Sequence, residues 1–244
     1  MLKLIFCAIL TLGIIDSINL GIETPIYGIK QEIYFPHREN PADYSFRNKY
    51  TFIKIDSLNI FEMESLFGVE DPNDDSKSIL KDTLNYFCWK GSKGVMYSPV
   101  FQERRTIKVL TNPDSVVNAY VGGFPQMDVR EKDYKLESVK DSLGLSKRFV
   151  YSIKSNEHFM SPDTIKLLLI KEKYELYHSF SKKIEAEHGM TLTDVRFIFN
   201  AKKHENKDYP KLEGYLTLRK VEIKENAFLS AVLKQFEIDK KLLR

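Results

Sequence analysis

The sequence predicts an α+β fold, in which one or more antiparallel sheets pack against a few helices, including an amphipathic helix at the carboxyl terminus. Two patterns support this prediction. Short runs of β-branched and aromatic residues cluster or alternate near both ends of the chain. Capping residues precede longer stretches with helical spacing in the middle and at the end. A hydrophobic content of 43% with 29% charged residues is ordinary for a folded domain and argues against disorder.

The first residues are typical of an export signal. A short basic start at residues 1–3 leads into an apolar run over residues 4–15, which ends at Asp16. This pattern predicts a signal peptide covering residues 1–21, with a mature start between Ser17 and Glu23. The run is shorter than the roughly 20 apolar residues of a membrane-spanning helix, so we expect no stable membrane span after signal removal. A buried first strand and an uncleaved anchor are the alternatives.

The remaining residues, 22–244, are predicted to form a single α+β domain. Charged residues accumulate over 126–140, so a division into two subdomains near that segment is the alternative. Cys88 is the only cysteine left after signal removal, which excludes an intrachain disulfide. A net charge of +3, spread evenly, argues against nucleic acid as a partner.

The first half of the chain is predicted to contain strands and one helix. Residues 32–35 and 50–55 favour two strands joined by a polar loop. Ser76 can cap a helix over residues 76–87, because Ile79, Leu80 and Leu84 recur with helical spacing. Strand-like residues at 105–110 and 116–121, closed by two glycines, predict a sheet at the centre.

The second half begins with Ser161-Pro162-Asp163, which predicts the start of a long helix that continues to about Ile184 and ends at Gly189. Alternating residues between 170 and 180 would instead suit a strand over part of this stretch.

The last part of the chain carries a clearer pattern. Residues 195–199 and 214–223 predict two antiparallel strands across a polar connection. Asn226 can cap the terminal helix, whose apolar stripe packs on the core. The stripe consists of Leu229, Val232, Leu233, Phe236 and Leu243.

Two motifs resemble metal sites but are interpreted otherwise. Residues 71–75 place oxygen ligands as in a calcium loop, yet Ser76 stands where the loop needs glycine and Asp82 where it needs glutamate, so we expect a solvated acidic loop. The Glu175–His178 and Glu185–His188 spacings match di-iron bundles, but both lie on one segment, where we expect an exposed polar helix face. No metal and no cofactor are predicted.

Residues 88–94 offer two further candidates. Residues 89–94 have the glycine, lysine and hydroxyl groups of a phosphate cradle without the P-loop order, and a turn is the favoured interpretation. Cys88 could act as a nucleophile if a base lay near it, but Phe87 and Trp89 beside it favour a buried structural cysteine.

These observations predict an exported protein, periplasmic, envelope-bound or extracellular, that most simply acts as a non-enzymatic binding or structural component. Its expected partner is another envelope protein or a glycan, bound by exposed aromatic residues on the early loops, although most of these aromatics suit a core. The alternative is an exported hydrolase with a site assembled from scattered residues such as Asp71, Cys88, His158 or His178. The sequence leaves open whether the protein is an enzyme, and its catalytic residues stay unknown.

Overall fold

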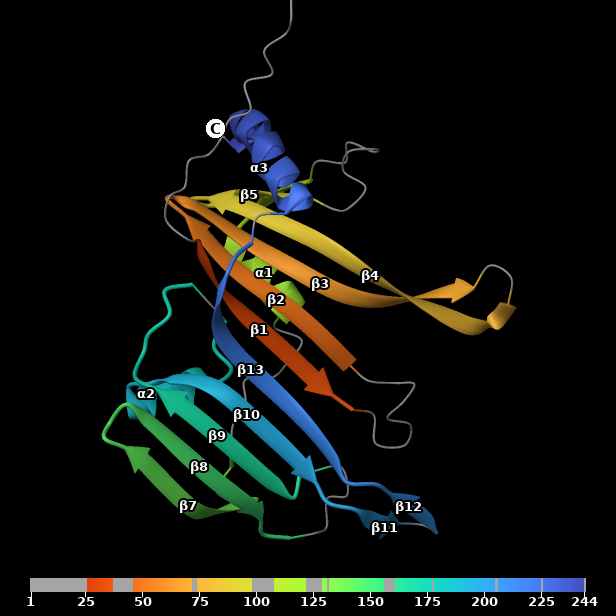
Figure 1. Cartoon of the computed structure of the whole chain (residues 1–244), viewed down its shortest axis with the longest axis vertical. Helices are drawn as coiled ribbons and strands as arrows, with labels where there is room; N and C mark the ends of the chain where they lie inside the picture. Colours follow the sequence, from red (N-terminus) through yellow and green to blue (C-terminus); the bar gives the residue numbers. More distant parts are fainter. Residues whose placement is uncertain are drawn as a thin grey trace, which may run out of the picture.

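One large antiparallel sheet organises the computed structural model (Figure 1), which describes residues 26–36, 46–71, 74–97, 108–121, 129–130, 132–155, 161–176, 178–204, 206–224 and 226–243. In this part of the chain the sheet has 11 strands in the order β6-β5-β4-β3-β2-β1-β13-β10-β9-β8-β7. Its strands are β1 Tyr27–Phe35, β2 Phe46–Ile55, β3 Leu58–Asp71, β4 Asp74–Lys90, β5 Lys93–Tyr97, β6 Lys108–Thr111, β7 Tyr134–Ser142, β8 Ser146–Ile153, β9 Thr164–Ile170, β10 Thr191–Phe199 and β13 Leu212–Glu222. The α+β prediction is confirmed.

The other described elements are short. β11 Lys202–His204 and β12 Lys207–Tyr209 form a small separate hairpin between β10 and β13. The helices are α1 Pro113–Val121, α2 Lys182–His188 and α3 Ala227–Asp239, followed by a 3₁₀ turn at Lys240–Leu243. None of the helices in the described residues has the length and apolar character that crossing a membrane requires.

Strand β1 lies near the middle of the sheet and joins its two halves. It pairs with β2, its neighbour in sequence, and with β13, the last strand of the chain. In Figure 1 the strands β2 to β5 extend to one side of β1, and β13, β10, β9, β8 and β7 extend to the other. Within each half, most strands pair with a strand that is close in sequence. The two halves are joined by the pair of β1 and β13, which are distant in sequence.

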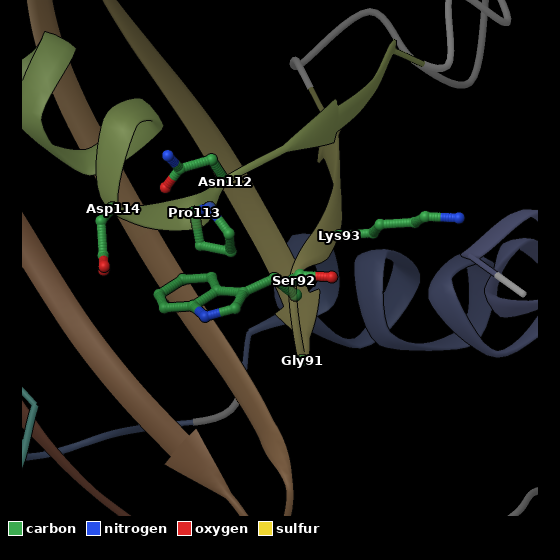
Figure 2. A pocket seen from close by; sticks show the side chains of 7 residues that line it. Gly91, Ser92, Lys93, Asn112, Pro113 and Asp114 are labelled. Carbon is green, nitrogen blue, oxygen red and sulfur yellow. The ribbon is translucent and has the colours of Figure 1, made fainter.

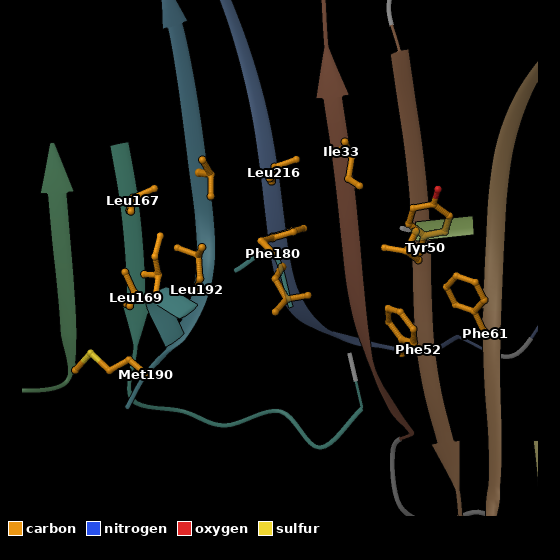
Figure 3. Close-up of a cluster of buried hydrophobic side chains, with 14 of the residues drawn as sticks. Ile33, Tyr50, Phe52, Phe61, Leu167, Leu169, Phe180, Met190, Leu192 and Leu216 are labelled. Carbon is orange, nitrogen blue, oxygen red and sulfur yellow. The ribbon is translucent and has the colours of Figure 1, made fainter. Parts of the chain in front are cut away.

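Both faces of the sheet bury apolar residues, and each is named here by a helix that covers it. The α1 face carries Phe87 and Trp89 of β4, together with α1, α2 and the larger apolar cluster. The α3 face carries Tyr86 and Cys88, the alternate residues of β4, beneath α3. Figure 3 shows the larger cluster as a row of side chains across neighbouring strands, from Leu167 to Phe61.

The predicted helix at 76–87 is wrong, because this segment belongs to strand β4. The helical spacing of Leu84 and Phe87 misled because the end of β4 is buried on both faces, with Phe87 in one apolar cluster and Tyr86 and Cys88 in the other. A strand covered on both faces shows no alternation of polar and apolar residues.

The predicted long helix after Ser161 is also wrong, since Thr164–Ile170 forms β9 and a helix appears only at Lys182–His188. Asp163 does not cap a helix. Its carboxylate accepts a hydrogen bond of 2.7 Å from the backbone N–H of Asn200 and lies 2.6 Å from the Lys202 ammonium, which ties the start of β9 to the end of β10. Gly189 does end the short helix, with a φ of 62°.

Of the other predicted elements, one is wrong and the rest are confirmed. Residues 116–121 are helical, not extended, whereas a strand does occur at Lys108–Thr111. The early strands, the antiparallel pair β10 and β13, and the terminal helix are confirmed. Asn226 caps α3 as predicted, by accepting a hydrogen bond of 2.8 Å from the N–H of Leu229. Strands on both sides of 126–140 belong to one sheet.

Candidate functional site

A hollow of about 440 Å³ opens beside the turn between β4 and β5. It is lined by Trp89, Gly91, Ser92, Lys93, Asn112, Pro113 and Asp114. In Figure 2 Asn112, Pro113 and Asp114 lie on one side of the turn, while the Lys93 side chain extends to the other. This volume lies within the usual range of small-ligand sites.

The turn at Gly91 and Ser92 forms the first wall of the hollow. Gly91 has a φ of 66°, a left-handed conformation that glycine adopts without steric cost. Trp89 opposes Gly94 and Lys90 opposes Lys93 across the hairpin, so Gly91 and Ser92 form the predicted turn. This prediction is confirmed.

The start of α1 forms the second wall. The backbone N–H of Asn112 donates to the carbonyl of Ser92 at 3.0 Å, which fixes this wall to the first. The Asn112 side-chain oxygen accepts a hydrogen bond of 3.3 Å from the N–H of Ser115, so Asn112 caps α1. Pro113 follows at the first helical position, where a missing N–H costs nothing. Asp114 in the first turn suits the positive end of the helix.

The aromatic floor of the hollow depends on a glycine. Trp89 is 7% exposed and its ring stacks on Phe87, with centroids 5.2 Å apart. A Cβ atom at Gly94 would lie 2.5 Å from the Phe87 ring and 2.7 Å from the Cβ of Trp89. Only glycine at this position lets both side chains lie close against β5, and any larger residue would push the floor out of place.

The chemical groups around the hollow suit binding through hydrogen bonds. The Ser92 hydroxyl, the Asn112 amide and the Asp114 carboxylate surround an aromatic floor. Such a set can bind a polar ligand and fix its orientation. Among the described residues, neither a cysteine nor a histidine lines the hollow.

The structure separates the residues that were candidates for a hydrolase. Cys88 is fully buried in the cluster under α3, and its burial raises the pKa of the thiol far above its ordinary value. Leu176 and Phe180, on either side of His178, pack instead in the cluster on the α1 face. Burial lowers the pKa of His178, and Lys182 lowers it further, so the imidazole is neutral at neutral pH. The residues that flank His178 therefore pack on the opposite face of the sheet from the thiol.

The other predicted candidates give no site. Asp71 ends β3, and Asp74 begins β4 opposite it, so the acidic segment belongs to a hairpin connection and not to the approach of a helix. The side chain of Asp71 and all of His158 lie outside the described residues. His188 ends α2, where its ring lies 4.8 Å from that of Phe149, while Glu175 precedes α2 and pairs with Lys54. In the described part of the chain no three His, Cys, Asp or Glu side chains are grouped to hold a metal ion.

On the α3 face, a network of charged and polar side chains is held together by hydrogen bonds and ion pairs among its own members. Arg47 and Tyr215 both donate to Glu32, at 2.8 Å and 3.1 Å. Burial raises the pKa of Glu32, but these hydrogen bonds and the Arg47 charge outweigh it and bring the pKa below its ordinary value. Arg196 lies over the Tyr215 ring and pairs with Asp194 at 2.9 Å. These pairs join β1, β2, β13 and β10, so their role is structural.

Sequence reasoning missed the second wall of the hollow. Asn112-Pro113-Asp114 has the cap, first-turn proline and early acid of a helix start, which was the signal available. The β-branched residues Val116 and Val117 favoured a strand instead. Without a helix start at Asn112, nothing in the sequence placed this segment beside the turn at residues 91–92.

No protein-family model matches this sequence, and no curated protein matches it closely enough to show kinship. The hollow is therefore interpreted through its own chemistry.

Proposed function

We propose that this chain is an exported, non-enzymatic binding protein whose hollow between the β4–β5 turn and α1 binds a glycan. The observation that carries the proposal is the composition of the hollow, in which a hydroxyl, an amide and a carboxylate surround an aromatic floor. Sugars present many hydroxyl groups, which pair with such donors and acceptors, and their C–H groups suit contact with aromatic side chains.

Binding is favoured over hydrolysis by the placement of the reactive groups. A hydrolase needs a nucleophile or an activated water with a base within hydrogen-bond reach. The Cys88 thiol is protonated and buried on the α3 face, whereas His178 belongs to the α1 side. Asp114 is the exposed carboxylate of the hollow, and the described lining residues supply no second carboxylate of the kind that glycosidase chemistry uses.

The export part of the proposal rests on the amino-terminal sequence. Residues 1–21 have the basic start and apolar run of a signal peptide. A protein that crosses into the envelope meets wall polysaccharides and surface glycans, which agrees with a sugar-binding role.

The test is binding of the protein, purified from its own host through a carboxyl-terminal tag, to a saccharide array and to isolated cell-wall polysaccharide. The variant Asp114→Asn keeps the shape of the hollow and removes its negative charge. Because a hydrogen bond to a charged group is worth about 1.5–3 kcal/mol, we expect affinity to fall roughly tenfold or more. The matched control is Asp208→Asn, an exposed aspartate on β12 that makes the same change of charge outside the hollow.

Two results would overturn this proposal. One is the absence of saccharide binding at millimolar concentrations by the wild-type protein. The other is equal loss in the Asp114 and Asp208 variants, which would assign the effect to net charge. Release of sugar or peptide products during the incubation would favour the hydrolase alternative.

A further inference from the structure

Strand β7 ends the sheet and is open on its outer side. It pairs with β8, and within the described residues no strand pairs with its other edge. Every residue from Lys135 to Ser142 is exposed, so neither face of the strand is covered. An open edge presents unpaired N–H and C=O groups that can pair with another strand.

Two apolar side chains on β7 are exposed on the same face. Leu136 and Val139 are 47% and 48% exposed. They oppose Tyr151 and Phe149 of β8, whose rings belong to the cluster of the α1 face. A bulge at Glu137 makes this possible, because two residues that are three apart in a strand otherwise point to opposite faces.

Tyr134 and Asp141 share the face of Leu136 and Val139, and the other side chains of β7 occupy the opposite face. Glu137 accepts a hydrogen bond of 2.5 Å from Ser152 and lies 3.5 Å from the Lys135 ammonium. Ser138 and Lys140 oppose Val150 and Arg148. The strand thus has one face that is apolar at its centre and ends at Asp141, and one polar and charged face, with the bulge between them.

This pattern is self-complementary when a second β7 runs antiparallel to the first. When the twofold axis lies between Glu137 and Ser138, Leu136 of the first copy opposes Val139 of the second. Val139 of the first copy likewise opposes Leu136 of the second. Every residue from Tyr134 to Asp141 then opposes a residue whose side chain lies on the same face of the joined sheet. A shift of one residue either way places Leu136 or Glu137 opposite a residue of the wrong face.

The bulge also favours a second copy over an unrelated strand. Strand β8 is regular and leaves one residue of β7 without an opposite neighbour at the bulge. A second β7 brings its own bulge to the same place, so Glu137 opposes Ser138 in both directions. We infer that β7 is the contact through which two copies of this chain associate, joining their sheets across an antiparallel β7–β7 pair.

The charged face indicates how strong this contact is. In the same register Lys135 opposes Lys140 of the second copy, twice, and like charges directly opposite weaken a strand pair. Glu137, beside Lys135, offsets part of this repulsion. We therefore expect a reversible dimer of modest affinity, in keeping with the small area that one strand pair buries.

The test is sedimentation velocity of the tagged protein from its own host, from low micromolar concentration to about 200 µM, a range that reveals modest affinities. The wild type is expected to shift from monomer to dimer. Val139→Lys is expected to raise the dissociation constant at least about tenfold, because it replaces the apolar pair with two charges. Leu145→Lys, the same kind of change at a residue 64% exposed in the turn beyond the paired region, is expected to leave it unchanged.

The variant Lys140→Glu distinguishes dimerisation in this register from nonspecific association. It turns both Lys–Lys pairs into Lys–Glu pairs, so the dimer is expected to tighten about threefold or more. A wild-type protein that stays monomeric throughout the range overturns the inference. So does a Lys140→Glu variant that dimerises no better than wild type, or a Val139→Lys variant that dimerises equally well while its circular dichroism confirms the fold.

Discussion

In the described part of the chain, Gln31 has a buried side-chain amide without a hydrogen-bond partner. It is fully buried on β1, where its neighbours across the strands are Tyr50 and Leu218. Neither its side-chain oxygen nor its nitrogen has a hydrogen-bond partner. Removing an amide from water without a compensating bond costs about 1–3 kcal/mol, so this residue lowers the stability of the fold.

Replacing Gln31 by methionine is expected to stabilise the protein by about 1–3 kcal/mol, because the unbranched shape is kept and the unpaired amide is lost. Urea unfolding monitored by fluorescence gives the free energy difference. Gln31→Ala serves as the comparison, since it removes the amide but leaves a cavity and is expected to gain less. A loss of stability in the methionine variant would mean that a bound water or ligand satisfies the amide.

Cys88 is expected to resist thiol reagents in the folded protein. Burial raises its pKa, and the thiolate is the reactive form, so little of it exists at pH 8 and no reagent reaches it. Labelling with a chromogenic disulfide should be slow in buffer and fast in 6 M guanidinium. Rapid labelling of the folded chain would contradict the burial and reopen the case for a reactive cysteine.

At the scale of elements, the sequence predicted best where one face of a strand meets solvent. β13 alternates Leu216 and Leu218 with more polar residues, and it was recognised. β4 was not, because the two apolar clusters cover its end, from Tyr86 to Trp89, on both sides. The Ser161-Pro162-Asp163 start was misread because Asp163 binds Asn200 and Lys202, which are distant in sequence. Such partners override local capping preference.

The cap of α3 gives a prediction at this scale. Asn226→Ala removes the bond to the Leu229 N–H and is expected to cost about 1 kcal/mol, within a range of 0.5–2. Lys234→Ala on the exposed side of the same helix is the control, with an expected change below about 0.5 kcal/mol. Thermal or urea unfolding measures both. Equal effects of the two changes would show that α3 is not held by its amino-terminal end.

At the scale of the whole molecule, the hollow was beyond prediction because its walls come from different segments. Residues 89–94 were recognised as a turn, but the bond from Asn112 to Ser92 that completes the site depends on the pairing of β5 with β6. Local patterns do not specify which strands pair. The candidate hydrolase site was predicted wrongly for the same reason, since Cys88 and the residues that flank His178 pack on opposite faces of one sheet.

Stability is expected to fall in alkaline solution. Burial raises the pKa values of Cys88, Tyr86 and Tyr97 above their ordinary values. Above about pH 8.5 for the thiol and pH 10 for the phenols, the unfolded chain releases protons that the folded chain retains, so unfolding becomes easier as pH rises. Urea midpoints from pH 7.5 to 10.5 measure this. In Cys88→Ala the decline should be shallower, and a flat wild-type profile would contradict the burial of these groups.

The amino terminus makes a prediction for the protein in its host. Residues 1–21 have the pattern of a signal peptide, so mass spectrometry of a carboxyl-terminally tagged copy is expected to find a chain that begins between Ser17 and Glu23. A signal-defective copy, with Leu10→Arg in the apolar run, should keep its full mass. Full-length protein in the wild-type sample would rule out the cleaved signal.

The central pairing of β1 with β13 has a consequence for the order in which the chain folds. Glu32 and Tyr215, bonded across that pair, are 183 residues apart in sequence. The ribosome must therefore make nearly the whole chain before the middle of the sheet can close, and contacts of such long range slow folding. Each half can form its own hairpins early, but the finished sheet waits for its last strand. A chain that folds late stays extended longer during synthesis, which is the form in which a protein can be threaded across a membrane.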